Sequence, residues 1–303
     1  MSLMFLTSFG QTGEPVTLQT KTGKLAGTLL VPLTKKPVPV ALLIAGSGPT
    51  DRNGNNSMMQ NNSLKMIADS LYAHGIASLR YDKRGIGESQ AAGPSEINLR
   101  FGNYVQDAEG WVKFLKQNKK FNSIIIIGHS EGSLIGMIAS QQKDVAKFIS
   151  LEGAGEPANV LIKEQLEKQP PYVLQMCNPI LDSLALGKTV DSVPQMLYAL
   201  FRPSVQPYLI SWFHYNPQKE ISKLHKPVLI VQGTTDIQVG MIDASHLAKA
   251  NPNAELVVIS GMNHILKDAP LDRSQNIQTY YKPNLPLNQQ LVKVMVKFIK
   301  GEK

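Results

Sequence analysis

Cysteine, long apolar runs and clustered basic residues are all scarce in this 303-residue chain. Cys177 is the only cysteine, so no disulfide can form within the chain. No group of Cys and His residues has the spacing of a metal site, and no apolar run has the length that a membrane span needs. The sequence therefore predicts neither a bound metal nor a membrane span.

The formal net charge of +8 comes from lysines scattered along the chain, which indicates a solvated basic surface and no nucleic-acid site. Gly85 and Gly87 are not followed by the Gly-Lys-Ser/Thr of a phosphate loop, so no nucleotide cofactor is expected. The hydrophobic content of 43% is enough for a large buried core.

The first residues leave the cellular compartment open. Met1–Gly10 lacks the basic start and the long apolar centre of a secretory signal. Met1-Ser2-Leu3 is also compatible with an expression leader that replaces a native signal. The cytoplasm and a periplasmic or secreted location both remain open.

Apolar strands alternate with helices along most of the chain, which predicts an α/β fold with helices on both faces of a mostly parallel, eight-stranded sheet. The first two strands are joined at Thr22-Gly23 in the manner of an antiparallel hairpin. The expected strands are 15–20, 24–31, 37–45, 76–81, 123–127, 145–151, 228–232 and 255–260, and the expected helices are 63–74, 101–118, 134–141, 241–250 and 287–299.

The alternation breaks between Gly153 and Lys226, in a helix-like segment rich in proline, methionine and aromatic residues. We expect residues 154–225 to be a helical lid inserted into a core made of 1–153 and 226–303. An insertion at the carboxyl edge of the sheet would cover a site built there. Alternatively, the segment only shields the core.

Residues Gly128-His129-Ser130-Glu131-Gly132 form a G-x-S-x-G turn between an apolar run and an expected helix. The glycines let the chain reverse sharply, so the Ser130 hydroxyl would stand out above the sheet as a nucleophile. The alternative is a chance match of five residues.

A serine hydroxyl needs an imidazole base and a carboxylate that orients the base. His264 follows the last expected strand, and Asp236 follows strand 228–232, so the order along the chain is Ser, Asp, His. Asp236 could instead cap helix 241–250, and His264 could simply hydrogen-bond a loop. Asp243 and Asp268 are the substitute candidates for the acid.

Attack on a carbonyl also requires backbone N–H groups that stabilise the oxyanion. Glu131, the residue after the candidate nucleophile, is expected to supply one at a helix N-terminus. The second is expected from Ser47, with Gly48 as the alternative, in the glycine-containing loop after strand 37–45.

With these residues, the stretches Tyr81–Ser89 and Gly46–Gly54 make the chain resemble the α/β-hydrolase superfamily, in particular its bacterial carboxylesterase and serine-aminopeptidase-like branch. The resemblance covers nearly the whole chain. It implies esterase-type acyl hydrolysis by Ser130, His264 and Asp236, without a metal or an organic cofactor. One departure is Ala45-Gly46, where many relatives have His-Gly; the donor N–H remains in place, with Ser47 and Gly48 as its candidates.

Neighbouring residues are expected to support the site. Asp82 and Arg84 should hold their turn by a charge-assisted hydrogen bond, and Asp51 and Arg52 should brace the oxyanion loop. His129 is expected to be a packing or turn residue.

The expected partner is a small-molecule ester with an apolar acyl or aryl group. Lid residues that could line such a pocket, or form the lid's own core, are Met176, Met196, Leu197, Tyr198, Phe201, Trp212, Phe213 and Tyr215. A serine aminopeptidase, whose ammonium-binding carboxylates would be Glu152, Glu156, Glu164 and Glu167, and a thioesterase are the enzymatic alternatives. A non-catalytic ligand-binding protein on the same scaffold is the alternative of another class. The oligomeric state remains open.

Overall fold

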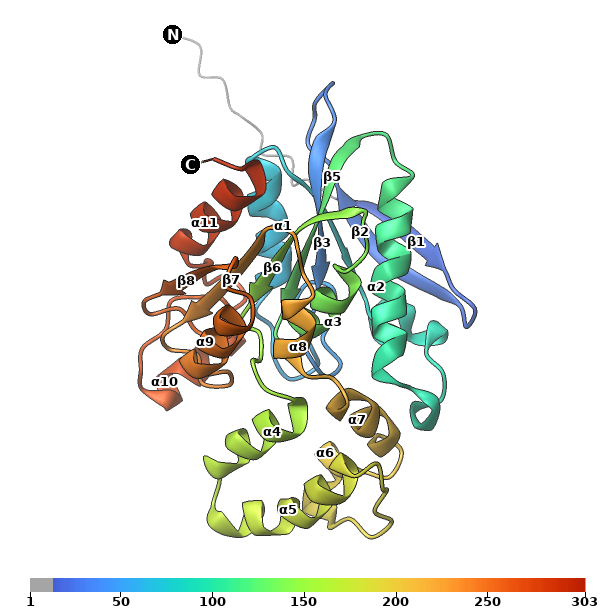
Figure 1. The fold of residues 1–303 in the computed structure, drawn as a ribbon, viewed down its shortest axis with the longest axis vertical. Coiled ribbons are helices and arrows are strands. Elements are labelled where there is room, and N and C mark those ends of the chain that lie inside the picture. The colour runs from blue at the N-terminus through green and yellow to red at the C-terminus, as the bar shows by residue number, and fades with distance from the viewer. Residues whose placement is uncertain (1–12, 303) are drawn as a thin grey trace.

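The computed structural model describes residues 13–302, and these contain one eight-stranded sheet (Figure 1). The strands lie in the order β1-β2-β4-β3-β5-β6-β7-β8. β1 and β2 are antiparallel, β2 is antiparallel to β4, and the other neighbours are parallel. The strands are β1 (Glu14–Gln19), β2 (Lys24–Leu30), β3 (Val38–Ile44), β4 (Ala77–Tyr81), β5 (Phe121–His129), β6 (Val145–Leu151), β7 (Val228–Gly233) and β8 (Glu255–Ile259).

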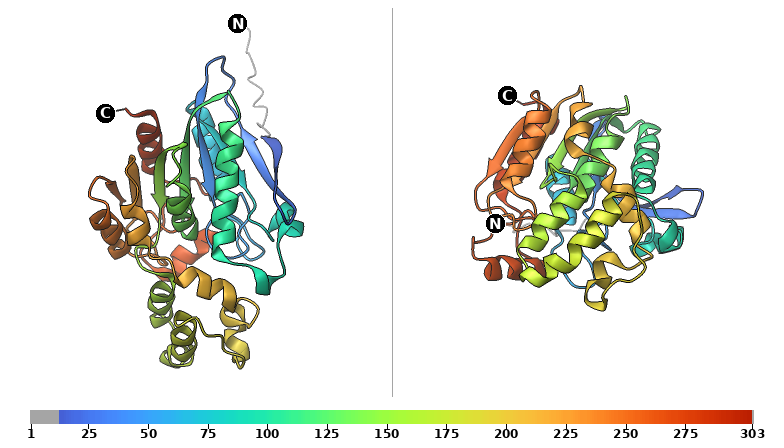
Figure 2. Two further views of the ribbon diagram at one scale, coloured as in Figure 1. Left: turned by 45° about the vertical axis from the view of Figure 1, so that its right-hand side comes forward. Right: turned by 60° about the horizontal axis from the view of Figure 1, so that its bottom comes forward.

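Helices cover both faces of the sheet, as the left view of Figure 2 shows. One face packs against α1 (Ser63–Ala73) and α11 (Gln289–Lys300). The other packs against α2 (Phe101–Lys116), α3 (Glu131–Ala139), α8 (Pro217–Ser222) and α9 (Met241–Ala250). The short elements are η1 (Gly87–Ala92), η2 (Glu96–Asn98), α10 (Arg273–Gln278) and η4 (Thr279–Tyr281).

The residue types explain these elements. β5 carries Ile124–Ile127, and alternate isoleucines enter the hydrophobic clusters on the two faces, as expected for a central parallel strand. In α11 the buried residues repeat at helical spacing. The Asn288 side chain accepts hydrogen bonds from the first N–H groups of α11, and Gly301, with φ 71°, ends the helix.

The predicted fold class is confirmed. Each expected strand is present, with boundaries that differ by a few residues, and the antiparallel start is confirmed. Helix α10 and the short η helices were not expected. The expectations about Met1–Gly10 and its leader lie outside the described residues.

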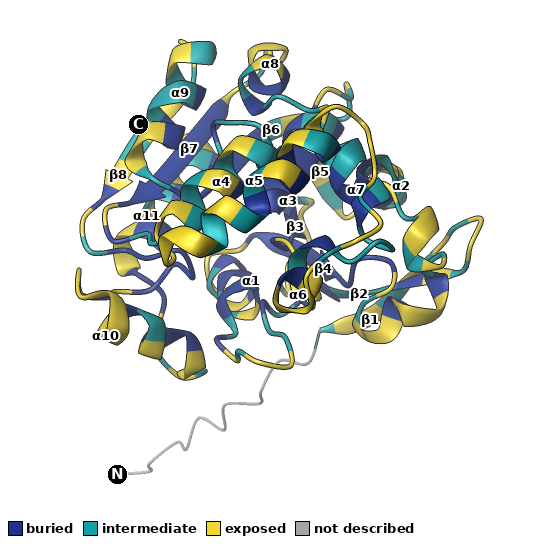
Figure 3. Cartoon of the chain, turned by 90° about the horizontal axis from the view of Figure 1, so that it is seen from below, coloured by how far each residue is buried: buried dark blue, intermediate teal, exposed yellow. Residues whose placement is uncertain are grey.

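The segment between β6 and β7 forms α4 (Ala158–Glu167), α5 (Pro171–Ala185), η3 (Gln195–Leu197), α6 (Tyr198–Phe201) and α7 (Gln206–Phe213), followed by α8. Helices α4 to α7 lie together beyond one end of the sheet (Figure 1), with exposed residues on the outer sides of α4 and α5 (Figure 3). Across residues 13–302, no helix combines the length and the apolarity needed to cross a membrane.

Candidate active site

Ser130 occupies a sharp turn between the carboxyl end of β5 and the start of α3. Its backbone has φ 55° and ψ −121°, a strained conformation for a residue that is not glycine. A Cβ on Gly128 would clash with the backbone of Gly132, and a Cβ on Gly132 would clash with the backbone of Ile44. The glycines of the G-x-S-x-G pattern are therefore required for this turn.

His264 and Asp236 are joined by a hydrogen bond. His264 Nδ1 lies 2.7 Å from Asp236 Oδ2, and both side chains are almost completely buried. The other oxygen, Oδ1, accepts the backbone N–H groups of Gln238 (2.7 Å) and Val239 (3.0 Å). Burial alone raises the pKa of Asp236, but the charge and hydrogen bond of His264 and the other donors outweigh it, so the net pKa is lowered.

The substitute acids make other contacts. Asp243 accepts hydrogen bonds from the backbone N–H groups of Gly155 and Gly240, and Asp268 accepts one from the Asn288 side chain. Within the described residues, Asp236 is the carboxylate that bonds the His264 ring.

Ser130 and His264 line one small cavity of about 140 Å³, together with Gly46, Ser47 and Tyr280. Among residues 13–302, no hydrogen bond joins the Ser130 hydroxyl to the His264 ring. Such bonds are often long without substrate and tighten in the reacting complex. The structure thus brings the three side chains to one edge of the sheet and joins two of them directly.

The loop after β3 passes over Ser130. A Cβ on Gly46 would lie 3.2 Å from the Ser130 Cβ, so this backbone approaches the serine closely. Ser47 lines the same cavity as Ser130, whereas Gly48 lines a second cavity. Glu131 is the first residue of α3, where a backbone N–H has no acceptor within the helix.

A buried network around the Glu131 side chain was not predicted. Lys83 Nζ lies 2.7 Å from Glu131 Oε2 and also donates to the Gly46 carbonyl oxygen at 2.6 Å. The Tyr208 hydroxyl, from α7, donates to the other Glu131 oxygen. Lys83 also lies over the Tyr104 ring, 4.8 Å from its centroid. The network joins the loop over Ser130 to α3 and to α7.

Arg52 and Asp51 brace the loop after β3, as expected, but Asp82 and Arg84 bond other partners and not each other. Asp82 accepts the Arg52 guanidinium and the Arg52 backbone N–H, both at 2.8 Å. Arg84 Nε donates to Asp107 at 2.7 Å. Asp51 accepts backbone N–H groups of its own loop. The expectation of an Asp82–Arg84 bond is wrong because each side chain has a better-placed partner from another segment.

His129 is buried beside the candidate base. Its Nε2 lies 2.7 Å from the His264 carbonyl oxygen, and the two ring centroids are 4.9 Å apart. Burial, followed by the neighbouring His264, lowers the pKa of His129 to about 3. These contacts are those of a packing residue.

The chain is similar to known hydrolases in sequence. The family model described as serine aminopeptidase, S33, matches residues 59–195. Esterase EstD of Thermotoga maritima is 25% identical over 255 residues, which are 80% of this chain and 58% of EstD. The chain thus spans somewhat more than half the length of that curated relative.

Solved structures share the fold. Est1E from Butyrivibrio proteoclasticus, solved with ferulic acid bound, superposes with a TM-score of 0.65 at 19% identity, covering 94% of this chain and 99% of its own. The Pyrococcus furiosus esterase Pf2001 superposes with a TM-score of 0.61 at 17% identity, covering 95% of this chain and 91% of its own. The α/β-hydrolase GrgF from a Penicillium species superposes with a TM-score of 0.63 at 19% identity, covering 95% of this chain and 98% of its own.

The chain has the α/β-hydrolase fold. In this chain, Ser130, Asp236 and His264 follow β5, β7 and β8, which is the order of triad residues in α/β-hydrolases.

A larger cavity of about 320 Å³ adjoins the loop after β3. It lies between that loop, the turn after β4 and the segment from Arg202, which follows α6, to Tyr208 in α7. Its lining includes Gly48, Lys83, Glu131 and Val205. The aromatic and methionine residues that the sequence suggested for a substrate pocket do not line it. Leu197 and Phe201 are instead buried in the hydrophobic core.

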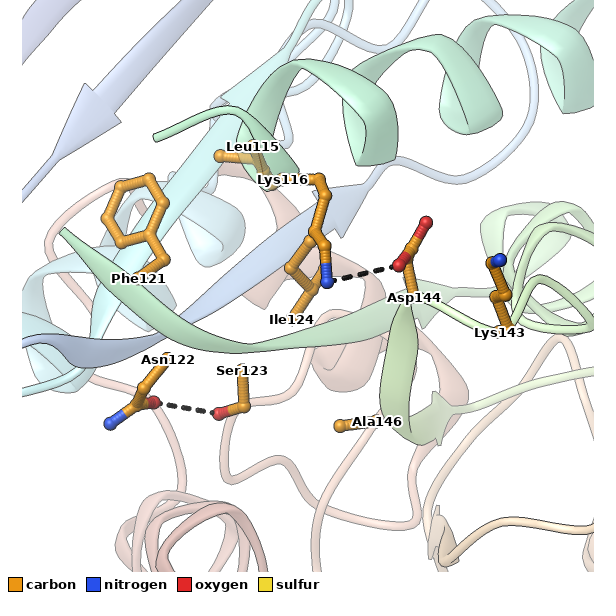
Figure 4. A pocket seen from close by; sticks show the side chains of 9 residues that line it. All are labelled: Leu115, Lys116, Phe121, Asn122, Ser123, Ile124, Lys143, Asp144 and Ala146. Carbon is orange, nitrogen blue, oxygen red and sulfur yellow. Dashed lines mark hydrogen bonds and ion pairs between the residues drawn. The ribbon is translucent and has the colours of Figure 1, made fainter. Parts of the chain in front are cut away.

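Another hollow, of about 150 Å³, lies at the amino end of β5 (Figure 4). Its lining includes Phe121 and Ile124, together with Lys116 and Asp144, whose charged groups are 3.1 Å apart. Ser130 follows the opposite end of the same strand, so this hollow is separate from the candidate active site. Among residues 13–302, no group of three or more His, Cys, Asp or Glu side chains could hold a metal ion.

Proposed function

We propose that this chain is a serine hydrolase that cleaves carboxylic esters of small molecules through an acyl-enzyme. Ser130 attacks the ester carbonyl, and His264 takes the hydroxyl proton and returns it to the leaving alcohol. Asp236 holds the imidazole in the required tautomer. A water molecule, activated by His264, then releases the acid.

In this proposal, the backbone N–H groups of Glu131 and Ser47 bind the oxyanion. Two observations support the choice: the Glu131 N–H lies at the start of α3, and Ser47 shares a cavity with Ser130. Gly48 is the alternative to Ser47. Loss of one such donor typically lowers turnover by roughly 100- to 1000-fold.

The observation that carries the proposal is the 2.7 Å bond between His264 and Asp236 at the edge of the sheet where Ser130 stands in its strained turn. The esterase relatives support the same reaction. An oriented imidazole and a serine hydroxyl that line one cavity are the groups that acyl transfer requires.

The two cavities suggest how an ester would be held. The cavity of about 140 Å³ around Ser130 fits a short group, and the cavity of about 320 Å³ fits a larger apolar or aryl group. Arg202, Val205 and Tyr208 contribute to the larger one. We therefore propose that residues 154–225 act as a lid that shapes this pocket, inserted in a core of 1–153 and 226–303.

A serine aminopeptidase is the second candidate because the matching family model carries that description. It would need carboxylates for the substrate ammonium group. Glu156 is paired with His246 at 2.7 Å, and Glu152 is fully buried, which leaves Glu164 and Glu167. A thioesterase would use the same triad.

The test is stoichiometric labelling by a fluorophosphonate. We expect the wild-type protein to be labelled and Ser130→Ala to be unlabelled and inactive. Ser57→Ala, at an exposed serine of the oxyanion loop, is the matched control and should label normally. A folded wild-type protein that takes no label would favour a non-catalytic ligand-binding protein.

A substrate panel separates the enzymatic candidates. We expect turnover of p-nitrophenyl esters, with a dependence on acyl length that reports the size of the pocket. Preferential cleavage of aminoacyl anilides would indicate the peptidase, and preferential cleavage of acyl thioesters the thioesterase.

A further inference from the structure

Glu152 follows β6 directly and is completely buried, with 0% of its surface exposed. Its two carboxyl oxygens lie 2.9 and 3.2 Å from the backbone nitrogen of Gly233, at the end of β7. Its own backbone N–H donates to the Val231 carbonyl oxygen at 3.0 Å. The side chain therefore points along the sheet edge toward the loop that carries Asp236.

The backbone of Glu152 is strained. Its φ of 49° lies in the left-handed region, which costs a residue other than glycine roughly 1–3 kcal/mol. Strain of this kind persists only where surrounding contacts hold the residue in place. Here those contacts are the ladder to β7 and the carboxyl group itself.

The carboxyl groups of Glu152 and Asp236 lie within hydrogen-bonding reach of each other in one turn: Glu152 bonds the Gly233 N–H at 2.9 Å, and the Asp236 N–H lies 3.5 Å from the Gly233 carbonyl oxygen. Two carboxylates cannot share a hydrogen bond unless one of them carries a proton. Asp236 already accepts hydrogen bonds from His264 and from two backbone N–H groups, which favour its charged form. Glu152 has the Gly233 N–H as its backbone donor, and no cation acts on it within the described residues.

We propose that Glu152 is a positioning residue for the candidate triad: it stays a neutral carboxylic acid near neutral pH and donates a hydrogen bond to the Asp236 carboxylate. This bond holds the carboxylate in line with the His264 ring. The inference rests on the proposed function, since it assigns Glu152 a part in the same reaction.

The surrounding charges agree with a proton on Glu152. Burial, then the charge of Asp236, raises the pKa of Glu152. The other titratable groups that face the pair are His264 after β8, His129 in β5 and Tyr280 in η4. Burial lowers the pKa of His129 and raises that of Tyr280, so both stay neutral. The carboxyl pair then carries one negative charge, on Asp236, which faces the imidazole of His264.

The first experiment detects the proton without any substrate. The infrared difference spectrum between the wild type and Glu152→Gln at neutral pH should contain the C=O stretch of a protonated carboxyl group, lost in the variant. A difference that shows only carboxylate bands would overturn the proposal.

The second experiment uses the pH profile of kcat/KM for a p-nitrophenyl ester. An amide at position 152 can still accept the Gly233 N–H and donate to Asp236. We therefore expect Glu152→Gln to keep its rate within roughly threefold of wild type, with an unchanged acid limb. If Glu152 were charged, its removal would lower the acid limb by roughly one pH unit or more, which would contradict the proposal.

Glu152→Met removes the donor at similar length. We expect kcat to fall by roughly 10- to 100-fold with KM little changed, because the imidazole is less well aligned. Full activity in a folded Glu152→Met protein would overturn the positioning role. Glu156→Gln, four residues along the chain, is the matched control, since Glu156 pairs with His246 and not with the triad.

These measurements distinguish failure of the proposed function from failure of the role assigned to Glu152. If the wild-type protein takes no fluorophosphonate and hydrolyses no ester, the proposed function fails. The infrared band still reports whether Glu152 carries a proton.

Discussion

Burial keeps the imidazole of His129, which adjoins the candidate base His264, uncharged. The folded protein lowers the pKa of this imidazole from 6.5 to about 3, so it stays neutral at pH values where an exposed histidine is protonated. Between these two values the unfolded chain binds a proton that the folded chain does not. Stability must therefore fall as the pH falls through this window.

We predict that His129 makes the protein less stable in mild acid. At pH 5 the loss relative to pH 7 should be about 2 kcal/mol from this residue. His129→Gln should remove that part of the pH dependence, whatever its effect at pH 7. Urea denaturation at both pH values measures it, and His74→Gln, at an exposed histidine, should leave the slope unchanged. If wild type and His129→Gln lose the same free energy of unfolding between pH 7 and pH 5, the assignment to His129 is wrong.

At the scale of elements, one buried ion pair connects three parts of the fold. Lys83 follows β4, Glu131 begins α3, and Tyr208 lies in α7, yet all three side chains meet beneath the loop over Ser130. Removal of one partner of such a pair leaves an uncompensated buried charge, which typically costs roughly 3–5 kcal/mol. Removal of both charges costs much less.

We therefore predict that Lys83→Met lowers the free energy of unfolding by roughly 3–5 kcal/mol and that adding Glu131→Gln recovers part of the loss. The backbone N–H of residue 131 remains in both variants. A double-mutant cycle of urea denaturation measures the coupling. Additive losses would mean that the two side chains do not act as a pair. Lys65→Met, which breaks the exposed pair between Lys65 and Asp69, is the control and should cost less than about 1 kcal/mol.

At the scale of the whole molecule, the inserted helices share a hydrophobic core with the sheet domain. Phe201 and Leu209 from the insertion belong to the same buried cluster as Phe101 and Trp111 of α2. The Phe101 ring packs against Trp212 of α7 with the planes 3° apart. The two parts should therefore unfold together.

We predict that Phe201→Ala unfolds in a single cooperative transition. Its free energy of unfolding should be roughly 3–5 kcal/mol lower than that of the wild type, because loss of the fully buried ring leaves a cavity. Tryptophan fluorescence and far-ultraviolet circular dichroism should give coincident curves. Tyr198→Ala, at an exposed ring of the same short helix, should shift the curve little. An early transition confined to the insertion would show that it folds independently.

The sequence predicts most of the sheet because buried apolar runs such as Ile124–Ile127 have one plausible place, at the centre of a parallel sheet. Ser130, Asp236 and His264 could be selected because each follows a strand, and parallel strands end at one edge. The Lys83–Glu131–Tyr208 network could not be predicted, since it joins residues far apart along the chain without a local pattern. The contact between Glu152 and Asp236 could not be predicted either, since it depends on the directions in which the two side chains point.

The hydroxyl of Tyr208 has a consequence for inhibition. It links α7 to Glu131, while Lys83 links Glu131 to the Gly46 carbonyl. A compound seated in the cavity of about 320 Å³ would contact Lys83, Glu131 and Tyr208, and so would act on the residues that join α7 to the loop over Ser130. Because the proposed ester would place its larger group in the same cavity, such a compound would compete with the substrate, and its kinetics would be those of a competitive inhibitor.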